Sequence, residues 1–522
     1  MKTFILLAIG VLMIASCEKK SPASIESRVD SLFRFWNRKD SPGAAVAVMQ
    51  NGKIVFSKGY GMANLEYDVP IIPQSVFHIA SESKQYTAFC MVLLQQEGKL
   101  KLDDDIRKHL PWVPDFGKKI TIRHLIHHTS GLRDQWQLFA IAGQELDDVI
   151  RQSEVVKLVE MQKELNFEPG SHHMYCNTGY SLMAEIVKSV TGQTLRAYAD
   201  EKIFKPLGMN NTHFHDDNTE IIMNRTYSYD SIKGKIVHSP LNYATVGATS
   251  LFTTVEDETK WLNNYVTGMV GGREAIDQMY EQGMLNNGGK LRYAFAINID
   301  SLMGYRRIGH GGADAGYRTY AMRIPEEDFG VVVFSNFAGF NSVGLAQKVT
   351  ALYLPDKSKK KDKPLAGGFD KSKYKDYVGT YRKRDDHTEF IIDKEQLTVK
   401  YEDEKYPLDQ ISDSTFASAN GREKITFNRD KNTGRVTGFM SATAYEEQLY
   451  ERYLPVSFED INPASYAGKY VSDELDATYY VEVKNGGVVL RHRRYDDGKM
   501  TPITKDQFTT GHWWMWNNKF CT

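Results

Sequence analysis

A lysine-rich run divides this chain and limits what either side of it can fold into. The run extends over residues 356–364 and is followed by two glycines, which is typical of a charged, solvated linker. At 522 residues the chain is also too long for one compact core. We therefore expect a large domain at 25–355, a linker at 356–370, and further domains beyond it.

The chain beyond the linker is β-rich and repeats a pattern. Residues 377–381 are echoed by residues 466–470, and alternating apolar and polar runs follow each of these segments. Such repeats predict small antiparallel meanders or half-barrels. We expect one unit at 371–455 and a second unit, which we expect to be incomplete, at 456–522.

The first residues have the composition of an export signal. Lys2 precedes an apolar run that is too short to span a bilayer, and residues 14–17 resemble the bacterial lipobox. We expect a lipoprotein-type signal at 1–17, lipidation of Cys17 and a tether at 18–24. The protein would then be exported and anchored to a bacterial membrane, facing the periplasm or the exterior. An ordinary cleaved signal with a free cysteine is the alternative.

Charge and cysteine content exclude several classes of partner and site. The formal net charge is −1 and the sequence has no long basic face, so nucleic acid is not an expected partner. The four cysteines have no paired spacing, which argues against a disulfide framework or a thiolate zinc site. The expected partners are a small-molecule or peptide substrate and, through the lipid, a membrane surface; the oligomeric state stays open.

Ser81 and Lys84 form the first chemical pattern. Ser81 follows an apolar pair and stands at the start of a predicted helix. The helix is predicted because residues 85–96 have helix-forming composition and spacing. Unsatisfied backbone N–H groups and the helix dipole there favour a serine that must become an alkoxide. Lys84 returns to the same helix face, and a desolvated lysine can act as a base. Ser-x-x-Lys is a short pattern, and Ser358 with Lys361 repeats it in the linker.

Two further stretches carry residues whose chemistry could assist a serine nucleophile and a lysine base. We expect Tyr175 and Asn177 on an extended or turning segment, where side chains at i and i+2 point the same way. A tyrosine beside a lysine can shuttle a proton, and an asparagine amide can hold a lysine and a substrate carbonyl. Gly311 and Gly312 after His310 would let a strand approach a ligand and free backbone N–H groups for an oxyanion. Taken singly, each stretch is explained equally well by a structural role.

Two histidine-rich stretches invite a metal hypothesis. His124, His127 and His128 have no carboxylate at ligand spacing, and a short helix explains them as well. His213 and His215 precede two aspartates, as in some metallohydrolases, but the further histidine of that pattern is absent. We interpret this stretch as a loop and hairpin, and predict no metal site and no cofactor.

In combination, the Ser81, Tyr175 and His310 motifs resemble those of the penicillin-recognising serine hydrolases in order and approximate separation. The resemblance covers about residues 25–355 and is closest to the branch of class C β-lactamases, D-aminopeptidases, DD-carboxypeptidases and related esterases. It implies an α+β fold in which helices flank an antiparallel sheet. The later β-rich units are similar to the lipocalin-like domains of some D-aminopeptidase-type hydrolases. Independently, Asn51-Gly52 between two apolar runs predicts an antiparallel hairpin.

The same resemblance assigns roles to the residues. Ser81 would attack a carbonyl and form an acyl-enzyme, while Lys84 and Tyr175 exchange its proton. The other implied contributors are Asn177, His310, Gly311 and Gly312 around the substrate, and the backbone N–H groups of Ser81 and Ala313 as the oxyanion hole.

His310 departs from the pattern of this family. Its β-lactamases carry a lysine at this position, whereas histidine is largely neutral at pH 7 unless a partner raises its pKa. Loss of that cation weakens the case for a β-lactam or a free C-terminal carboxylate as substrate. We therefore predict a serine hydrolase that acts on a D-amino-acid-containing peptide or a small ester, with weak or absent β-lactam turnover.

Two other function classes stay open. In one, the chain is a non-catalytic lipoprotein with a vestigial site that binds β-lactams or peptidoglycan peptides, and labelling of Ser81 by a covalent probe would exclude it. In the other, the chain is a metallohydrolase, which would lose its activity to chelators.

Overall fold

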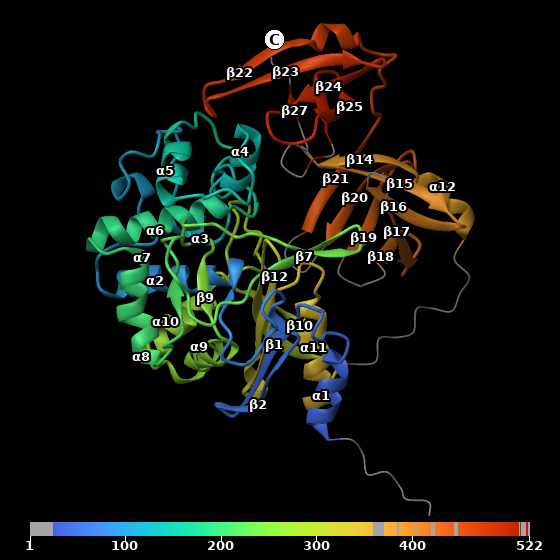
Figure 1. Ribbon diagram of the computed structural model, residues 1–522. Coiled ribbons are helices and arrows are strands. Elements are labelled where there is room, and N and C mark those ends of the chain that lie inside the picture. The colour runs from blue at the N-terminus through green and yellow to red at the C-terminus, as the bar shows by residue number, and fades with distance from the viewer. Residues whose placement is uncertain are drawn as a thin grey trace, which may run out of the picture.

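The computed structural model describes residues 24–358, 370–383, 386–401, 404–418, 423–442, 447–510, 512 and 518–519. Cys17, the predicted signal and most of the predicted linker lie outside these residues, so anchoring and export stay predictions. Within the described residues, no helix is both long and hydrophobic enough to cross a bilayer. Figure 1 shows a mixed helix and sheet domain, followed by two smaller all-β units.

The first domain is built on a six-stranded antiparallel sheet, which confirms the predicted fold class. The strand order is β10-β11-β12-β13-β1-β2. Asn51 and Gly52 both have positive φ in the turn between β1 and β2, as the hairpin prediction requires. The bounds are β1 (Ala44–Gln50), β2 (Lys53–Tyr60), β10 (Asn298–Leu302), β11 (Tyr305–Asp314), β12 (Tyr317–Ile324) and β13 (Phe329–Ser335).

Helices cover both faces of this sheet. Alternate residues of β1 belong to different cores: Ala45 and Ala47 face one, and Val46 and Val48 face the other. Helices α1 (Ile25–Phe33) and α11 (Ser342–Tyr353) pack on the second side. Helices α2 (Ser83–Gln96), α9 (Val255–Thr267) and α10 (Gly272–Met279) pack on the first.

A helical subdomain completes the first core and supplies one wall of the site. Its main elements are α4 (Gln135–Ala142), α5 (Gln152–Glu160) and α6 (Asn177–Thr191), and α6 packs against α2. A three-stranded sheet in the order β5-β9-β6 lies beneath it, with β5 (Phe77–His78), β6 (His213–Phe214) and β9 (Leu251–Thr253). The other elements are α3 (Ile122–Ile126), α7 (Leu195–Ala199), α8 (Lys205–Leu207), β3 (Met62–Asn64), β4 (Val69–Pro70), β7 (Tyr229–Ile232) and β8 (Lys235–His238).

The first C-terminal unit is a closed barrel of eight antiparallel strands that follows α12 (Tyr374–Tyr377). It closes where β14 pairs with β21, so the expected half-barrel is a full one. Its core is aromatic, with Tyr381, Phe390, Phe427 and Phe439 in edge or tilted contact. The strands are β14 (Gly379–Lys383), β15 (Asp386–Asp393), β16 (Gln396–Tyr401), β17 (Glu404–Gln410), β18 (Thr415–Ser418), β19 (Lys424–Arg429), β20 (Val436–Ala442) and β21 (Glu447–Tyr453).

The second C-terminal unit is a six-stranded sheet in sequential order. Its strands are β22 (Gly468–Ser472), β23 (Ala477–Lys484), β24 (Gly487–Arg491), β25 (Gly498–Thr504), β26 (Gln507–Thr509) and β27 (Asn518–Lys519). The divisions at 355, 370 and 455 fall between elements, and as domain boundaries they stay predictions.

This second sheet docks on the helical subdomain, next to α4 (Figure 1). Arg494 donates to Asp148 at 3.0 Å, and the Tyr495 hydroxyl donates to the Gln144 carbonyl at 3.0 Å. Tyr479 donates to the Ile141 carbonyl, and the Ile141 side chain packs against the sheet's own core. The end of α4 and the segment after it are thus fastened by residues more than 300 positions further along the chain.

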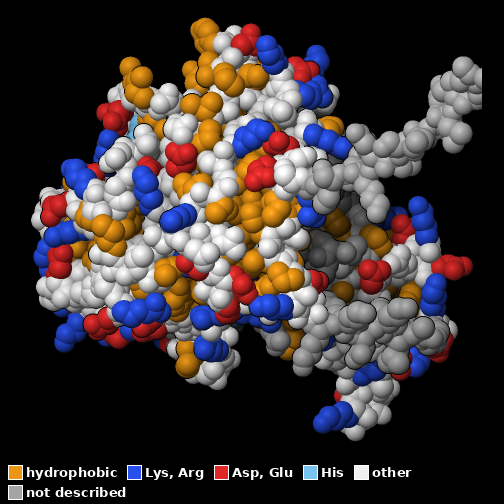
Figure 2. Space-filling view, turned by 90° about the horizontal axis from the view of Figure 1, so that it is seen from below, with side chains coloured by type: hydrophobic (Ala, Val, Ile, Leu, Met, Phe, Trp, Pro, Cys, Tyr) orange, Lys and Arg blue, Asp and Glu red, His pale blue; other side chains and the backbone are white. Residues whose placement is uncertain are grey.

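The outer surface mixes charges of both signs. Figure 2 shows Lys and Arg side chains interspersed with Asp and Glu over the face seen from below Figure 1. This arrangement agrees with the near-zero net charge and gives that face no single electrostatic sign.

Candidate active site

Ser81 lies on a single 3-10 turn, η1 (Ala80–Glu82), that leads directly into α2. Ala80 has φ of 49°, a left-handed conformation that is costly for a residue with a Cβ and is concentrated at functional sites. Strand β11 holds this turn closely. A Cβ on Gly312 would lie 2.1 Å from the Ile79 carbonyl oxygen, so only glycine lets the strand approach. The structure thus gives Gly312 a packing role beside the nucleophile.

Lys84 lies one helical turn after Ser81 and is fully buried. Its Nζ is 3.0 Å from Ser81 Oγ, 2.8 Å from Asn177 Oδ1 and 2.7 Å from the Ala248 carbonyl oxygen. Burial lowers the pKa of Lys84 to about 7, although nearby acidic groups oppose the shift. Two of the three partners can only accept hydrogen bonds. A neutral amine would donate to those two and keep its lone pair for the Ser81 hydroxyl, the arrangement a general base needs.

Asp134 fixes the orientation of Asn177. Its Oδ2 accepts from the Asn177 backbone N at 2.6 Å and from Nδ2 at 2.8 Å, which turns Oδ1 toward Lys84. Asp134 also caps α4 by accepting from Trp136 N at 2.9 Å. Our sequence analysis did not single out Asp134. The available signal was an aspartate directly before a helical run, which marks an N-cap.

Tyr175 lies on the irregular segment that precedes α6. Its ring centre is 4.9 Å from Lys84 Nζ, and its ring packs on His128 with centroids 4.1 Å apart. The side chain is 39% exposed, so a substrate can reach it. Helix α6 starts at Asn177, three residues earlier than the apolar pattern from Tyr180 indicated, because Asp134 satisfies the first backbone N–H.

His310 is buried behind Tyr175 in a hydrogen-bonded chain. A backbone N–H can only donate, so His128 Nδ1 accepts from Cys176 N at 3.1 Å and Nε2 donates to Tyr293 Oη at 3.2 Å. The Gly311 carbonyl can only accept, so His310 Nδ1 donates to it at 2.7 Å. His310 Nε2 then accepts from Tyr293 Oη at 3.1 Å. Burial, aided by the Lys84 charge, lowers the pKa of His310 to about 4, so the ring is neutral at pH 7.

A pocket of about 300 Å³ opens over Ser81. Its walls include an aromatic pair, Trp136 and Tyr243, stacked with centroids 4.7 Å apart. Among the described residues that line it, Asp314 is the one carboxylate, and none is a lysine or arginine. The lining residues are Ser81, Trp136, Leu146, Tyr175, Asn177, Tyr243, Ala313 and Asp314.

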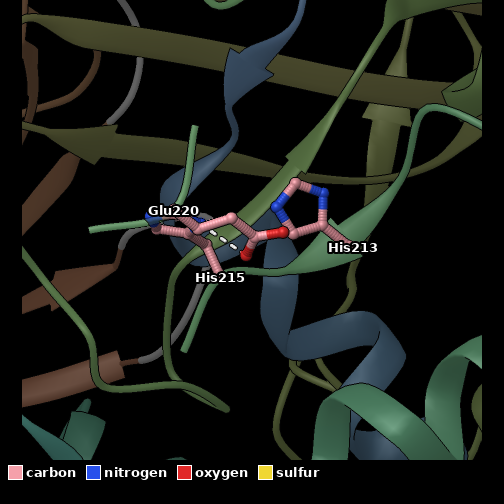
Figure 3. Close-up of side chains that lie close together, drawn as sticks. All are labelled: His213, His215 and Glu220. Carbon is pink, nitrogen blue, oxygen red and sulfur yellow. Dashed lines mark ion pairs between the residues drawn. The ribbon is translucent and has the colours of Figure 1, made fainter. Parts of the chain in front are cut away.

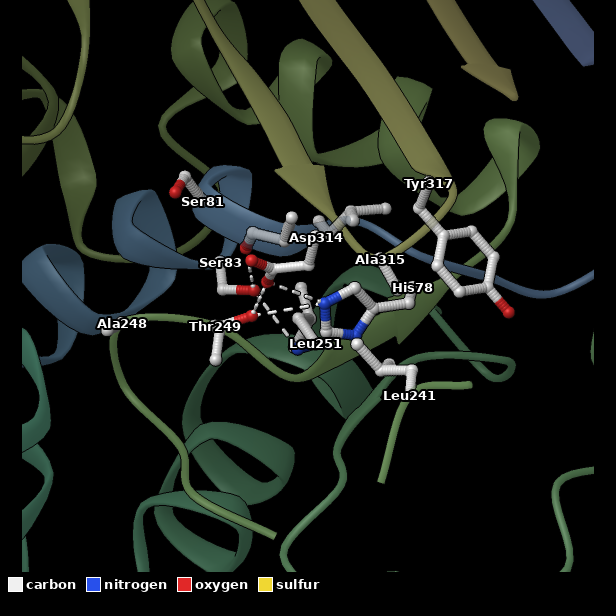
Figure 4. Close-up of polar contacts among 12 residues, drawn as sticks. His78, Ser81, Ser83, Leu241, Ala248, Thr249, Leu251, Asp314, Ala315 and Tyr317 are labelled. Atoms are coloured by element: carbon white, nitrogen blue, oxygen red, sulfur yellow. Dashed lines mark hydrogen bonds and ion pairs between the residues drawn. The ribbon is translucent and has the colours of Figure 1, made fainter. Parts of the chain in front are cut away.

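Asp314 is held by a polar network that joins three segments (Figure 4). His78 Nε2 lies 2.9 Å from Asp314 Oδ2, and the Thr249 hydroxyl donates to the same oxygen. These residues come from β5, from the end of β11 and from the segment before β9, so the network ties together the elements around Ser81.

Most of the predicted site residues therefore meet at one place. The pocket is lined by Ser81, Tyr175, Asn177 and Ala313. Lys84 is not part of the lining, but its Nζ is hydrogen-bonded to Ser81 Oγ. Three others lie off the lining. These are His310, Gly311 and Gly312, which form the stretch of β11 behind it.

Comparisons with known proteins identify relatives of this chain. The Beta-lactamase family model matches residues 26–352. A D-aminopeptidase of Brucella anthropi is 26% identical over 458 residues, which cover 86% of this chain and 82% of that protein. A D-aminopeptidase of Gluconobacter oxydans is 26% identical over 357 residues, 66% of each chain.

Two solved structures share the fold. An octameric penicillin-binding protein homologue from Pyrococcus abyssi superposes with a TM-score of 0.58 and 23% identity, covering 90% of this chain and 98% of that one. A D-amino acid amidase from Ochrobactrum anthropi SV3 does so with a TM-score of 0.52 and 21% identity, covering 63% and 96%.

Proposed function

Because the chain belongs to the beta-lactamase family, and thereby to the serine hydrolases, we propose that Ser81 forms an acyl-enzyme with an amide or ester. The preferred substrate in this proposal is a D-aminoacyl amide or short peptide whose amino group is free. A small ester is the second choice, since the acyl-enzyme chemistry is the same.

The contacts of Lys84 support the first chemical step. Neutral Lys84 takes the Ser81 proton while the Ser81 oxygen bonds to the substrate carbonyl carbon. The backbone N–H groups of Ser81 and Ala313 stabilise the resulting oxyanion. Tyr175, beside the Lys84 ammonium, passes the proton to the leaving amine or alcohol. Water then attacks the acyl carbon and gives a proton to Lys84, and Lys84 passes that proton to the departing Ser81 oxygen, which restores the neutral amine and the hydroxyl.

The charge of the residues that line the pocket supports the choice of substrate. Asp314 places a carboxylate in the wall, and the described lining has no lysine or arginine to bind a substrate carboxylate. His310, where related β-lactamases have a cation, is buried and neutral. A substrate ammonium is therefore favoured, whereas a β-lactam carboxylate or a free peptide C-terminus is disfavoured. The D configuration is taken from the related aminopeptidases and amidase.

A covalent probe tests the nucleophile. We expect a fluorophosphonate to label the purified chain and to leave Ser81→Ala unlabelled, with hydrolysis reduced by about 10⁴-fold or more. Ser231→Ala, which removes an exposed hydroxyl from the β7–β8 hairpin, is the matched control and keeps full labelling. Labelling that survives in Ser81→Ala, or no labelling of the wild type, would reject the acyl-enzyme.

Matched substrates test the role of Asp314. We expect D-aminoacyl p-nitroanilides to be cleaved faster than their N-acetylated forms and faster than the L series, with penicillins poor substrates. A hydrogen bond to a charged group is worth about 1.5–3 kcal/mol, so Asp314→Asn should reduce this amine preference roughly 10- to 100-fold. The ratio of the two substrates cancels any effect of the variant on Lys84. An unchanged ratio would remove Asp314 from recognition.

A further inference from the structure

His213, His215 and Glu220 form a second group of polar side chains, away from Ser81. Strand β6 pairs with β9, and side chains two positions apart on an extended segment point to the same side. The turn after His215 then brings Glu220 back to the two rings (Figure 3). The potential ligand atoms of the three residues all lie within 4.8 Å of one another. None of the three lines the pocket over Ser81.

Three of the four ring nitrogens of this group are buried without hydrogen-bond partners among the described residues. His215 is 2% exposed, and among the described residues neither Nδ1 nor Nε2 has a partner. Glu220 Oε2 lies 3.7 Å from His215 Nδ1, which is too far for a hydrogen bond. His213 Nε2 is in the same condition. Since buried polar atoms are nearly always paired, three such nitrogens in one place indicate a missing ligand.

The carboxylate of this group is held in place and kept anionic. Arg196 donates to Glu220 Oε2 at 2.5 Å and to Oε1 at 2.8 Å, and this pairing lowers the pKa of Glu220. A carboxylate has about four lone-pair sites, so the two bonds from Arg196 leave it able to bind a cation. The ionised groups that face the rings are two arginines and three carboxylates: Arg196, Arg225, Asp216, Asp217 and Glu220. Their sum is one negative charge.

We propose that His213, His215 and Glu220 bind one divalent transition-metal ion of the zinc class. Two imidazole nitrogens and one carboxylate oxygen are a ligand set that Zn²⁺ accepts, with water as the fourth ligand. The ion fastens the loop after β6 to the β5-β9-β6 sheet. That sheet also contains β5, which leads into the Ser81 turn, but none of the three ligands lines the pocket over Ser81, so the ion acts as a structural clamp rather than as a reactant.

Calorimetric titration with ZnCl₂ tests this site on the full chain, purified without a histidine tag and stripped by a chelator. We expect one Zn²⁺ per chain. Loss of an outer-shell partner typically lowers metal affinity about 10- to 100-fold, so His215→Ala, which removes a ligand, should lower it by at least about 100-fold. His238→Ala removes an exposed histidine from β8 and should leave the affinity unchanged. Absence of saturable binding, or equal binding by wild type and His215→Ala, would overturn the site.

A second variant protects the test against misfolding. Glu220 is partly exposed, so Glu220→Gln should fold even if His215→Ala does not, and it should lose the visible Co²⁺ spectrum that the wild type shows. An unchanged Co²⁺ spectrum in Glu220→Gln would exclude this ligand set. Hydrolysis should persist after chelation, because the site is structural. Loss of hydrolysis would place the ion in the reaction and overturn the clamp.

Discussion

Two of the groups that contain buried histidines differ in their hydrogen bonding. In the first, His128, Tyr293 and His310, each of the four ring nitrogens has a partner. We call this the relay cluster. In the second, His213, His215 and Glu220, three ring nitrogens have none among the described residues. We call this the loop cluster.

The difference indicates what each cluster is for. Burial of the relay cluster is compensated by hydrogen bonds, so it is complete as it stands and forms a rigid floor under Tyr175. Burial of the loop cluster is uncompensated, which costs stability until a ligand supplies the missing bonds. Buried histidines alone therefore do not identify a metal site, whereas several unpaired histidine nitrogens gathered beside a carboxylate do.

The largest effect is expected from cutting the relay cluster. Tyr293→Phe leaves His128 Nε2–H and His310 Nε2 without their partner, at about 1–3 kcal/mol for each buried group. We expect the free energy of unfolding to fall by about 2–6 kcal/mol in a urea titration. Turnover should fall as well, because the residues that pack under Tyr175 would no longer hold its ring in place. A loss below about 1 kcal/mol would show that the chain of bonds is not intact.

Zinc binding at the loop cluster should change the free energy of unfolding by an amount comparable to the loss expected for Tyr293→Phe. At a free Zn²⁺ concentration 100 times the Kd, binding to the folded state stabilises it by about 2.7 kcal/mol. We expect this gain in thermal denaturation of wild type and of Tyr293→Phe, and not of His215→Leu. Equal gains in all three would mean that zinc binds elsewhere.

The pH dependence of the hydrolysis rate should show that Lys84, and not the relay cluster, is the group that titrates. The pKa of Lys84 is about 7, so hydrolysis is fastest above pH 7 and falls about tenfold per unit below it, as Lys84 gains a proton. His310→Gln should leave this limb of the rate profile in place. Loss of the limb in that variant would identify His310 as the titrating group.

Stability should respond to acid in a different window. The pKa of His310 is about 4 in the folded state against 6.5 for an ordinary histidine, so the unfolded chain binds more protons between these values. Stability is therefore lost as the pH falls from 6.5 to about 4. Urea titrations across this window should show a smaller loss for His310→Gln than for wild type.

The smallest effect is expected at the loop cluster without metal. His215→Leu is similar in volume and removes no hydrogen bond that the described residues make, so in chelator the free energy of unfolding should change by less than about 1 kcal/mol. A loss of 2 kcal/mol or more would show that His215 has a partner even in the absence of zinc.

Local spacing predicted only part of the site. Ser81 and Lys84 are one helical turn apart, so their contact follows from the sequence. The Ala248 carbonyl, which also holds Lys84, has no residue-type signature, since any residue could supply it. Glu220 joins the loop cluster through a turn whose shape the sequence pattern did not give.

At the level of whole elements, too, local patterns were predicted from the sequence, whereas contacts between distant residues were not. The alternating runs predicted the strands of the first C-terminal unit, but its closure depends on pairing β14 with β21, about 70 residues apart. The family resemblance implied that His310 lies beside the substrate. In the structure Gly312 packs closely on the Ile79 carbonyl, and the His310 ring turns inward to Tyr293.

The docked second sheet has a consequence for synthesis. Leu146 of the pocket wall lies in the stretch that Tyr479, Arg494 and Tyr495 fasten, and these three residues are synthesised more than 300 residues after it. A nascent chain that ends before residue 456 would carry Ser81, Lys84 and Tyr175 but a loosely closed pocket. The wall at Leu146 would then be set later than the catalytic groups.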